Sequence, residues 1–540
     1  MMPSVFTSFR NSKDQERIMA LPRMGSSLDA YAGTLAFAGD IHNHCDISYG
    51  HGSLEDAYRN ARLQLDFGSV TGHANWHDMP DTPADVNEYH RRGFARLKDQ
   101  WAHVQDVTEG VHQDGVFVSL LSFEWHSMTY GDHCIYYKSG RGPLRPATAN
   151  SLEELRCELR KLKARGLNAL AVPHHIGYLP GRRGINWGTY SEEFAPVVEI
   201  VSMHGCGEHD QAPRKYLHTM GPRDTQSTAQ HGLELGKVFG FIGSTDHHSA
   251  HPGSHGYGRA MVWAEELTRD GIWNAIRARR TYAVTGDRIM LATSVNGHPM
   301  GSEILSNGDR EIAIEVAGGD SVDYVELVRN GDIIARASPT AAPENLFDGV
   351  LSVSVGWGEV GVKAAWDIEL EVLGGVITAV EPRLHGTDIV APSDAVKGKF
   401  SFSAWRQIDE HRVVFTTETR GNPTVTTDAT QQLALHVTGD ERTVLVGRFN
   451  GVEMKHSIAE LLRGSRAAYT GGFLSGGILM HRASPRNSRQ VNLELVDKGS
   501  GSHRDWYYAR VRQHNDQYAW SSPTWVKRQH SSPQLPRESQ

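Results

Sequence analysis

At 540 residues the chain is too long for one ordinary core, so two or three domains are expected. Its 39% apolar and 22% charged residues are typical of a globular protein. A formal net charge of -8 gives no general electrostatic reason to bind nucleic acid or an acidic membrane, although local basic clusters could hold a small anion.

The N-terminal region contains a short histidine motif. Residues 1–30 show no clear periodicity and are expected to form an extended or poorly ordered leader. The next stretch, FAGDIHNHCD, ends an apolar run with His42 and His44, which point to the same side of a strand because side chains alternate. Two imidazoles at this spacing can bind the same metal ion. A capping-box pattern at Ser53 then predicts a helix, as a similar pattern does later at Ser151. SVTGH is the next expected strand, ending at His73.

Strands that end in metal-binding residues recur along the first half. FEWH ends with Glu124 and His126, GDHCIYYK carries His133, AVPHH ends with His174 and His175, VEIVSMHG carries Glu199 and His204, and GFIGSTDHH ends with Asp246, His247 and His248. Of the 29 histidines, 20 lie before residue 260, where an even spread would place about half. Helical segments separate these strands, so the pattern predicts a parallel, barrel-like sheet with a multinuclear metal site at its strand ends.

From about residue 290 the pattern changes to alternating apolar and polar residues. Runs such as DIELEV, QQLALHV and VNLELV predict antiparallel β structure, and Asn330-Gly331 predicts a hairpin turn. The length allows one large sandwich or two small ones. The four cysteines form no CxxC pair, and we find no export signal and no apolar run long enough to span a membrane. A cytoplasmic protein without a membrane span is therefore expected.

The motif set DIHNHCDIS, VTGH, FEWH, HCIYY, PHH and STDHH resembles the PHP superfamily, named for polymerase and histidinol phosphatase domains. RRTYAVTGDRI and AWSSPTWV are similar to a bacterial branch in which β domains follow the PHP barrel. The resemblance covers most of the chain. It implies an α/β fold: a distorted seven-stranded β/α barrel over 31–290, then an all-β sandwich region over 291–530, with a tail over 531–540.

The resemblance also implies a set of metal ligands. Carried over residue by residue, they are His42, His44, His51, His73, Glu124, His133, His174, Asp246 and His248. Of His174 and His175, one is expected to ligate while the other hydrogen-bonds a strand, and His174 is favoured. Imidazole and carboxylate without thiolate suit two or three Zn, Mn or Fe ions, with Glu124 bridging two of them.

Two motifs depart from the family pattern. The sequence has Ser48-Tyr49-Gly50 where the family has Ser-Asp-Gly, and Thr71-Gly72-His73 where it has Thr-Asp-His. We interpret the missing aspartates as groups that orient imidazoles. His77 and Asp78 are candidates to compensate.

The function predicted from the sequence is a metal-dependent hydrolase, with a phosphoesterase favoured. Metal-bound hydroxide would attack, Asp246 would orient it or accept its proton, and His204 would act as general acid, unless His204 is only a hydrogen-bonded barrel residue. Arg182 and Arg183 would bind a small anionic substrate, or else belong to a solvated surface loop. The alternatives are a lactone, ester or amide hydrolase, and a carbohydrate- or surface-binding protein with a structural metal site.

Overall fold

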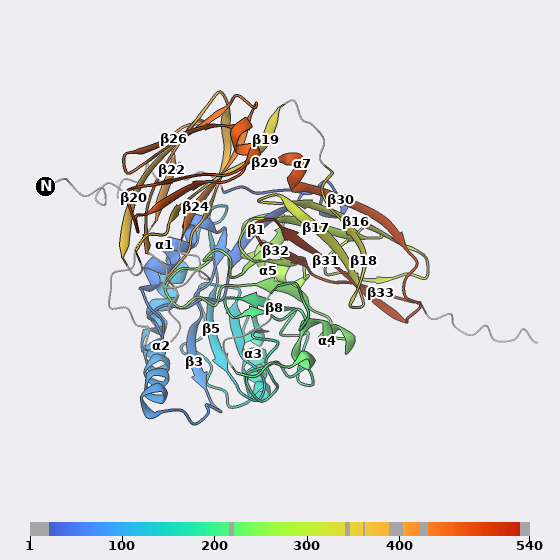
Figure 1. Cartoon of the computed structure of the whole chain (residues 1–540). Helices are drawn as coiled ribbons and strands as arrows, with labels where there is room; N and C mark the ends of the chain where they lie inside the picture. Colours follow the sequence, from blue (N-terminus) through green and yellow to red (C-terminus); the bar gives the residue numbers. More distant parts are fainter. Residues whose placement is uncertain are drawn as a thin grey trace, which may run out of the picture.

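The computed structural model describes residues 21–214, 221–340, 346–359, 362–387, 403–420 and 430–529, so residues 1–20 of the expected leader and the expected tail lie outside it. The chain is a mixed α/β protein with many sheets (Figure 1). Most of its helical residues lie in the first half. The α-helices are α1 (Leu54–Gln64), α2 (Ala84–Gly110), α3 (Leu152–Ala164), α4 (Ala229–Glu234), α5 (Arg269–Arg277), α6 (Ile458–Arg463) and α7 (Arg486–Arg489).

The strands of the first half belong to three sheets. They are β1 (Leu35–Asp40), β2 (Phe67–Gly68), β3 (Gly72–Trp76), β4 (Val118–Ser119), β5 (Leu121–His126), β6 (His133–Tyr137), β7 (Ala169–Pro173), β8 (Val197–Ser202), β9 (Gly205–Cys206), β10 (Gly240–Gly243), β11 (Arg259–Ala264) and β12 (Thr281–Val284). One sheet contains β12-β11-β1-β2-β4, the second is β3-β5-β6-β7, and the third is β10-β8-β9. These described strands therefore do not form one continuous seven-stranded barrel sheet.

The strand directions also differ from the expected parallel sheet. β1 and β2, β3 and β5, and β8 and β10 pair in parallel, but β6 is antiparallel to both β5 and β7, and β11 is antiparallel to β1. Only residues 127–132 join β5 to β6. A connection of this length can form a hairpin, whereas a parallel return needs a dozen or more residues.

Two helices begin where the sequence predicts. Ser53 caps α1 by accepting the Asp56 backbone N–H, and Ser151 caps α3 by accepting that of Glu154, both at 3.2 Å. α2 runs along the outer side of the first half beside β3 (Figure 1) and buries Leu97. Apolar helix faces thus cover the strands whose ends carry the histidines. Among the described helices, none combines the length and apolar character needed to cross a bilayer.

The second half consists mainly of antiparallel strands. They are β13 (Met290–Val295), β14 (His298–Pro299), β15 (Glu303–Leu305), β16 (Arg310–Ala317), β17 (Val322–Arg329), β18 (Asp332–Ala337), β19 (Phe347–Gly356), β20 (Lys363–Leu373), β21 (Val376–Arg383), β22 (Ala404–Gln407), β23 (Arg412–Arg420), β24 (Gln431–Gly439), β25 (Val444–Phe449), β26 (Val452–Ser457), β27 (Arg466–Tyr469), β28 (Gly477–Met480), β29 (Ser484–Pro485), β30 (Gln490–Asp497), β31 (Arg504–Gln513), β32 (Tyr518–Ser521) and β33 (Thr524–Lys527). The sheets β21-β24-β19-β28-β27 and β22-β23-β20-β25-β26 contribute side chains to one common core. Asn330 and Gly331 form the predicted hairpin turn, both with positive φ, between β17 and β18.

Hydrogen bonding crosses the expected domain boundary near residue 290. β12 pairs with β32, so the sheet that contains β1 continues into β31 and β33. The segment before β1 bridges to β1 at Met24 and Ala36 and also contacts the second half. The Ser27 backbone N–H donates to Glu315 Oε2 at 2.7 Å, and the buried Tyr31 hydroxyl donates to the Thr293 carbonyl at 2.7 Å. These contacts differ from the loosely ordered leader expected up to residue 30.

Candidate metal centre

Ten buried side chains with metal-binding atoms gather at the ends of the first-half strands. They are His42, His44, His73, Glu124, His126, His174, His175, His204, Asp246 and His248. They come from segments that are far apart in the sequence: the residues after β1, β7, β8 and β10, and the strands β3 and β5. Strand ends from several sheets therefore converge on one centre.

Asp246 contacts histidines through both of its carboxylate oxygens. Oδ1 lies 3.2 Å from His42 Nε2 and 3.0 Å from His44 Nε2. Oδ2 lies 3.1 Å from His175 Nε2 and 3.0 Å from His204 Nε2. Burial alone would raise the pKa of Asp246, but the histidines, His42 first among them, outweigh burial and hold this pKa well below its usual range.

Glu124, like Asp246, contacts histidines through both of its carboxylate oxygens. Its Oε1 lies 2.9 Å from His174 Nε2 and 3.1 Å from His126 Nδ1. Its Oε2 lies 3.4 Å from His73 Nε2 and 3.6 Å from His44 Nε2. A carboxylate with imidazoles at both oxygens has the arrangement expected of a ligand that bridges two cations.

Several atoms in this centre lack a hydrogen-bond partner. Among the described residues, Glu124 Oε2 and the Nδ1 atoms of His44, His174 and His175 are buried without one. His42 Nε2 and His44 Nε2 lie only 3.2 Å apart. Buried polar atoms are normally paired, so convergent lone pairs without aligned protons fit a divalent cation.

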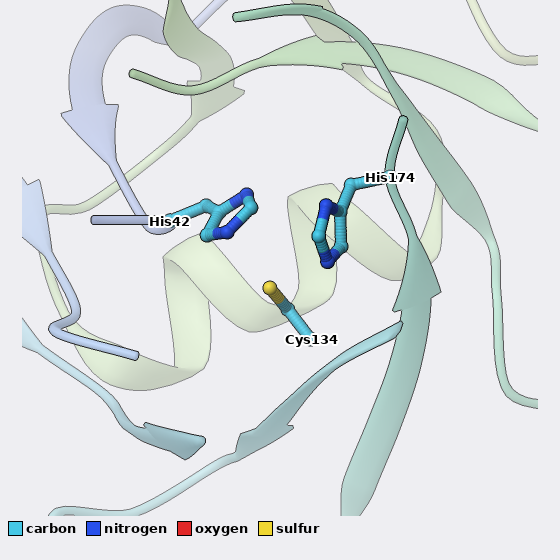
Figure 2. A group of neighbouring side chains, drawn as sticks. All are labelled: His42, Cys134 and His174. Atoms are coloured by element: carbon cyan, nitrogen blue, oxygen red, sulfur yellow. The ribbon is translucent and has the colours of Figure 1, made fainter. Parts of the chain in front are cut away.

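The candidate ligands overlap in several groups. The ligand atoms lie within 4.8 Å of one another in each of these sets: His44, His73 and His248; His42, His44 and Glu124; His73, Glu124 and His126; Glu124, Asp132, His174 and His175; and His42, Cys134 and His174 (Figure 2). The centre therefore offers more ligands than one four-coordinate ion requires.

Seven of the nine predicted ligands make the contacts described above, and the other two are His51 and His133. His133 is on β6, where its ring stacks edge-on to Trp125 at 6.0 Å and its Nδ1 lies 2.8 Å from the Gly131 carbonyl oxygen. The backbone N–H of His51 donates to the His248 carbonyl at 2.9 Å, and its side chain is half-buried. Ligation by His51 or His133 stays a prediction.

The two predicted substrate-binding arginines differ in position. Arg183 donates from Nε to Asp132 Oδ2 at 2.6 Å, and its guanidinium lies 5.0 Å from the Trp76 ring centroid. Its Nη2 lies 3.3 Å from His126 Nδ1, so it lines the edge of the centre. Arg182 is exposed.

His126 and Glu199 are named among the strand-end residues but are left out of the predicted ligand set. Glu124 and His126 repeat the two-residue spacing of His42 and His44, which was a usable signal for His126. Burial alone would lower the pKa of His126, but the charges of Glu124 and Asp132 raise it to about 9. Glu199 Oε2 contacts His42 Nδ1 at 2.9 Å, and burial raises the pKa of Glu199 to about 7.

The structure gives a physical account of both departures from the family motifs. The Tyr49 hydroxyl lies 2.6 Å from His126 Nε2, and its ring stacks on His73 with centroids 3.5 Å apart. A Cβ at Gly72 would lie 2.5 Å from Leu97 Cδ1, so the packing of α2 leaves no space for an aspartate there.

His77 and Asp78 lie outside this arrangement. Asp78 accepts the backbone N–H groups of Met128 and Thr129, each at 2.9 Å, and therefore anchors the loop between β5 and β6. The ring of His77 stacks on Trp125.

Comparisons with known proteins find partial matches. The model of a family of unknown function, DUF3604, matches residues 253–309. An uncharacterized protein of Chlamydia pneumoniae is 24% identical over 265 residues, 45% of this chain and 41% of that protein. One of Chlamydia trachomatis is 29% identical over 173 residues, 29% of this chain and 28% of that protein. The match thus spans less than half the length of these relatives.

One solved structure is similar over a large part of its length. It is a Bacteroides vulgatus protein described as a two-domain protein containing a predicted PHP-like metal-dependent phosphoesterase. The similarity has a TM-score of 0.30 and 15% sequence identity, and it covers 61% of this chain and 86% of that chain. A likeness of this size supports no argument about fold or chemistry.

Proposed function

We propose that the chain is a metal-dependent hydrolase of the PHP type, and more specifically a phosphoesterase acting on a small anionic substrate. The observation that carries the proposal is the convergence of buried imidazoles on both oxygens of Glu124 and both oxygens of Asp246. We further propose that residues 31–290 form a barrel-like unit built from separate sheets, that residues 291–530 form β sandwiches, and that the protein is cytoplasmic.

Two or three divalent ions in this centre would neutralise phosphate oxygens and lower the pKa of a water molecule. Glu124, His42, His44, His73 and His174 would hold them, with Asp246 and His248. Zn, Mn and Fe suit these nitrogen and oxygen donors. The chain's own groups would then orient the substrate and move protons.

Asp246 and His204 are the proposed acid–base pair. The 3.0 Å contact between Asp246 Oδ2 and His204 Nε2 gives a direct path for a proton between the two side chains. Asp246 would accept or orient the proton of the attacking water, and His204 would protonate the leaving group. His175, 3.1 Å from the same oxygen, would keep Asp246 in place.

Arg183 is the proposed contact for the anionic group. Its position is fixed by Asp132 and Trp76, and a held guanidinium fork matches phosphate geometry. Arg182 would act only as an outer charge, because it is exposed.

The number of candidate ligands favours phosphate over a carbonyl substrate. A phosphoryl group needs its oxygens neutralised while a nucleophile approaches in line, which suits more than one cation. An ester or lactone carbonyl needs only one polarising ion. The surplus of ligands around Glu124 therefore supports the phosphoesterase over the alternatives.

The test offers aryl phosphate monoesters, phosphate diesters, lactones and carboxyl esters to chelated protein with Zn, Mn or Fe added back. We expect phosphate release, lowered more than about tenfold by Glu124→Gln, which keeps the size of the side chain but removes its charge. Glu153→Gln, on the exposed face of α3, is the matched control. Turnover of a lactone or carboxyl ester without release of phosphate would overturn the proposal.

A further inference from the structure

The register of β6 decides which of its side chains reach the metal centre. Cys134 is directly opposite Glu124 on β5, and His133 is opposite Trp125. Cross-strand partners lie on the same face of a sheet, and neighbours along a strand lie on opposite faces. Cys134 therefore shares the face of Glu124, whereas His133 shares the face of Trp125, which is buried in an apolar core.

The register of β6 against β7 also places Cys134 on the face of the metal centre. Cys134 is also opposite Val172 on β7, and His174 follows two residues later on the same side. Figure 2 shows the side chains of His42, Cys134 and His174 pointing toward one another. The Cys134 sulfur and one nitrogen of each histidine lie within 4.8 Å of one another.

An independent observation indicates a ligand at this point. His174 is only 1% exposed, and its Nδ1 has no hydrogen-bond partner among the described residues. Its Nε2 lies 2.9 Å from Glu124 Oε1. A cation held by both groups would account for this approach.

We propose that Cys134 binds a metal ion as a thiolate together with His42 and His174, in the place that the family resemblance gives to His133. The proposal rests on the metal centre of the proposed function. Zn–N bonds of about 2.0 to 2.1 Å and a Zn–S bond of about 2.3 Å would put neighbouring ligand atoms about 3.4 to 3.6 Å apart. The three ligand atoms lie within 4.8 Å of one another, so their separations exceed that spacing by at most about 1.4 Å.

A thiolate changes which ions suit the centre. Soft sulfur favours Zn, Fe(II) and Co(II) over Mn and Mg, which prefer oxygen ligands. The ion at His42, Cys134 and His174 is therefore zinc or iron, and Mn is confined to the part of the centre that has only nitrogen and oxygen donors.

The experiment replaces the native ions with Co(II) in the full-length chain. Sulfur bound to Co(II) gives a charge-transfer band in the near ultraviolet, which imidazole and carboxylate do not produce. The exposed Cys157 is first replaced by Ser to remove adventitious binding. In that background we compare Cys134→Ser with Cys206→Ala, a control at another buried cysteine that packs among apolar side chains.

We expect the band in the background protein and in Cys206→Ala, and its loss in Cys134→Ser with more than about tenfold weaker binding of one Co(II) ion. Zinc-edge X-ray absorption on the unaltered chain is a second measurement that does not depend on a variant, with a Zn–S distance of about 2.3 Å expected. Bound Co(II) without the band, or zinc without a sulfur neighbour, would overturn the proposal. Either result is independent of phosphate release, so it is distinguishable from failure of the proposed function.

Discussion

Gly386 gives a direct test of whether the second half of the chain supports the metal centre. The segment after β21 packs on the loop between β10 and β11, which carries Asp246 and His248. Leu384 accepts the His255 backbone N–H at 2.9 Å, and the Gly386 N–H donates to Ser254 Oγ at 3.0 Å. Gly386→Ala would place a methyl group inside this contact.

The size of the effect expected from Gly386→Ala follows from the space around Gly386. An added Cβ would lie 2.4 Å from His247 Cε1 and 2.5 Å from His251 Cβ, so the loop must move. Overpacking of this kind costs about 1 to 3 kcal/mol. His247 lies between Asp246 and His248, so relief of the strain displaces both ligands. If all of the strain reaches them, metal affinity falls about 5- to 150-fold.

The assay titrates chelated protein with Zn in competition with an indicator, and measures the free energy of unfolding in urea. Gly110→Ala is the control, because a Cβ at that end of α2 meets nothing within 4 Å. We expect weaker Zn binding only in Gly386→Ala. A Gly386→Ala protein that loses stability but binds Zn like the parent would refute the coupling between the two halves.

Two further predictions concern individual side chains. Tyr49→Phe keeps the ring that stacks on His73 but removes the hydroxyl that contacts His126. We therefore expect metal affinity to fall about tenfold in the same titration. Unchanged affinity would show that Tyr49 does not orient His126. Burial, partly offset by Asp287, lowers the pKa of His255 to about 4. The unfolded chain takes up this proton below about pH 6.5, so stability falls as pH drops from about 6.5 to about 4, by at most about 1.4 kcal/mol per pH unit. His255→Gln should reduce that slope in urea unfolding between pH 6.5 and 5, and an unchanged slope would contradict the assignment.

Local features of the fold could be predicted from the sequence because they depend on neighbouring residues. The caps at Ser53 and Ser151 and the Asn330-Gly331 turn follow from short-range backbone chemistry. Strand alternation predicts the pair His42 and His44; the two residues follow β1, with an isolated bridge at Asn43 between them, and both imidazoles contact Asp246. Each of these predictions needs only a few consecutive residues.

Features that depend on strand pairing could not be predicted from a few consecutive residues. The choice between His133 and Cys134 is a choice of face, and a shift of one residue reverses every side chain of a strand. Only the register of β6 against β5 decides it. In the same way, the pairing of β12 with β32 leaves no local signal in the sequence, whereas the short connection between β5 and β6 does indicate an antiparallel pair.

The position of the second half explains why the metal centre need not be an independent unit. The candidate ligands all come from residues before 249, yet residues 384 and 386 hold the loop that carries two of them. β12 also takes its partner β32 from the C-terminal region. A fragment ending near residue 290 would leave β12 without this partner and the ligand loop without its support. All the candidate donors would still be present, and first-half bonds such as that from the Asp246 N–H to the His42 carbonyl at 2.7 Å would remain. The loop would nevertheless lose its contacts with Leu384 and Gly386, so we expect the geometry of the centre to depend on both halves.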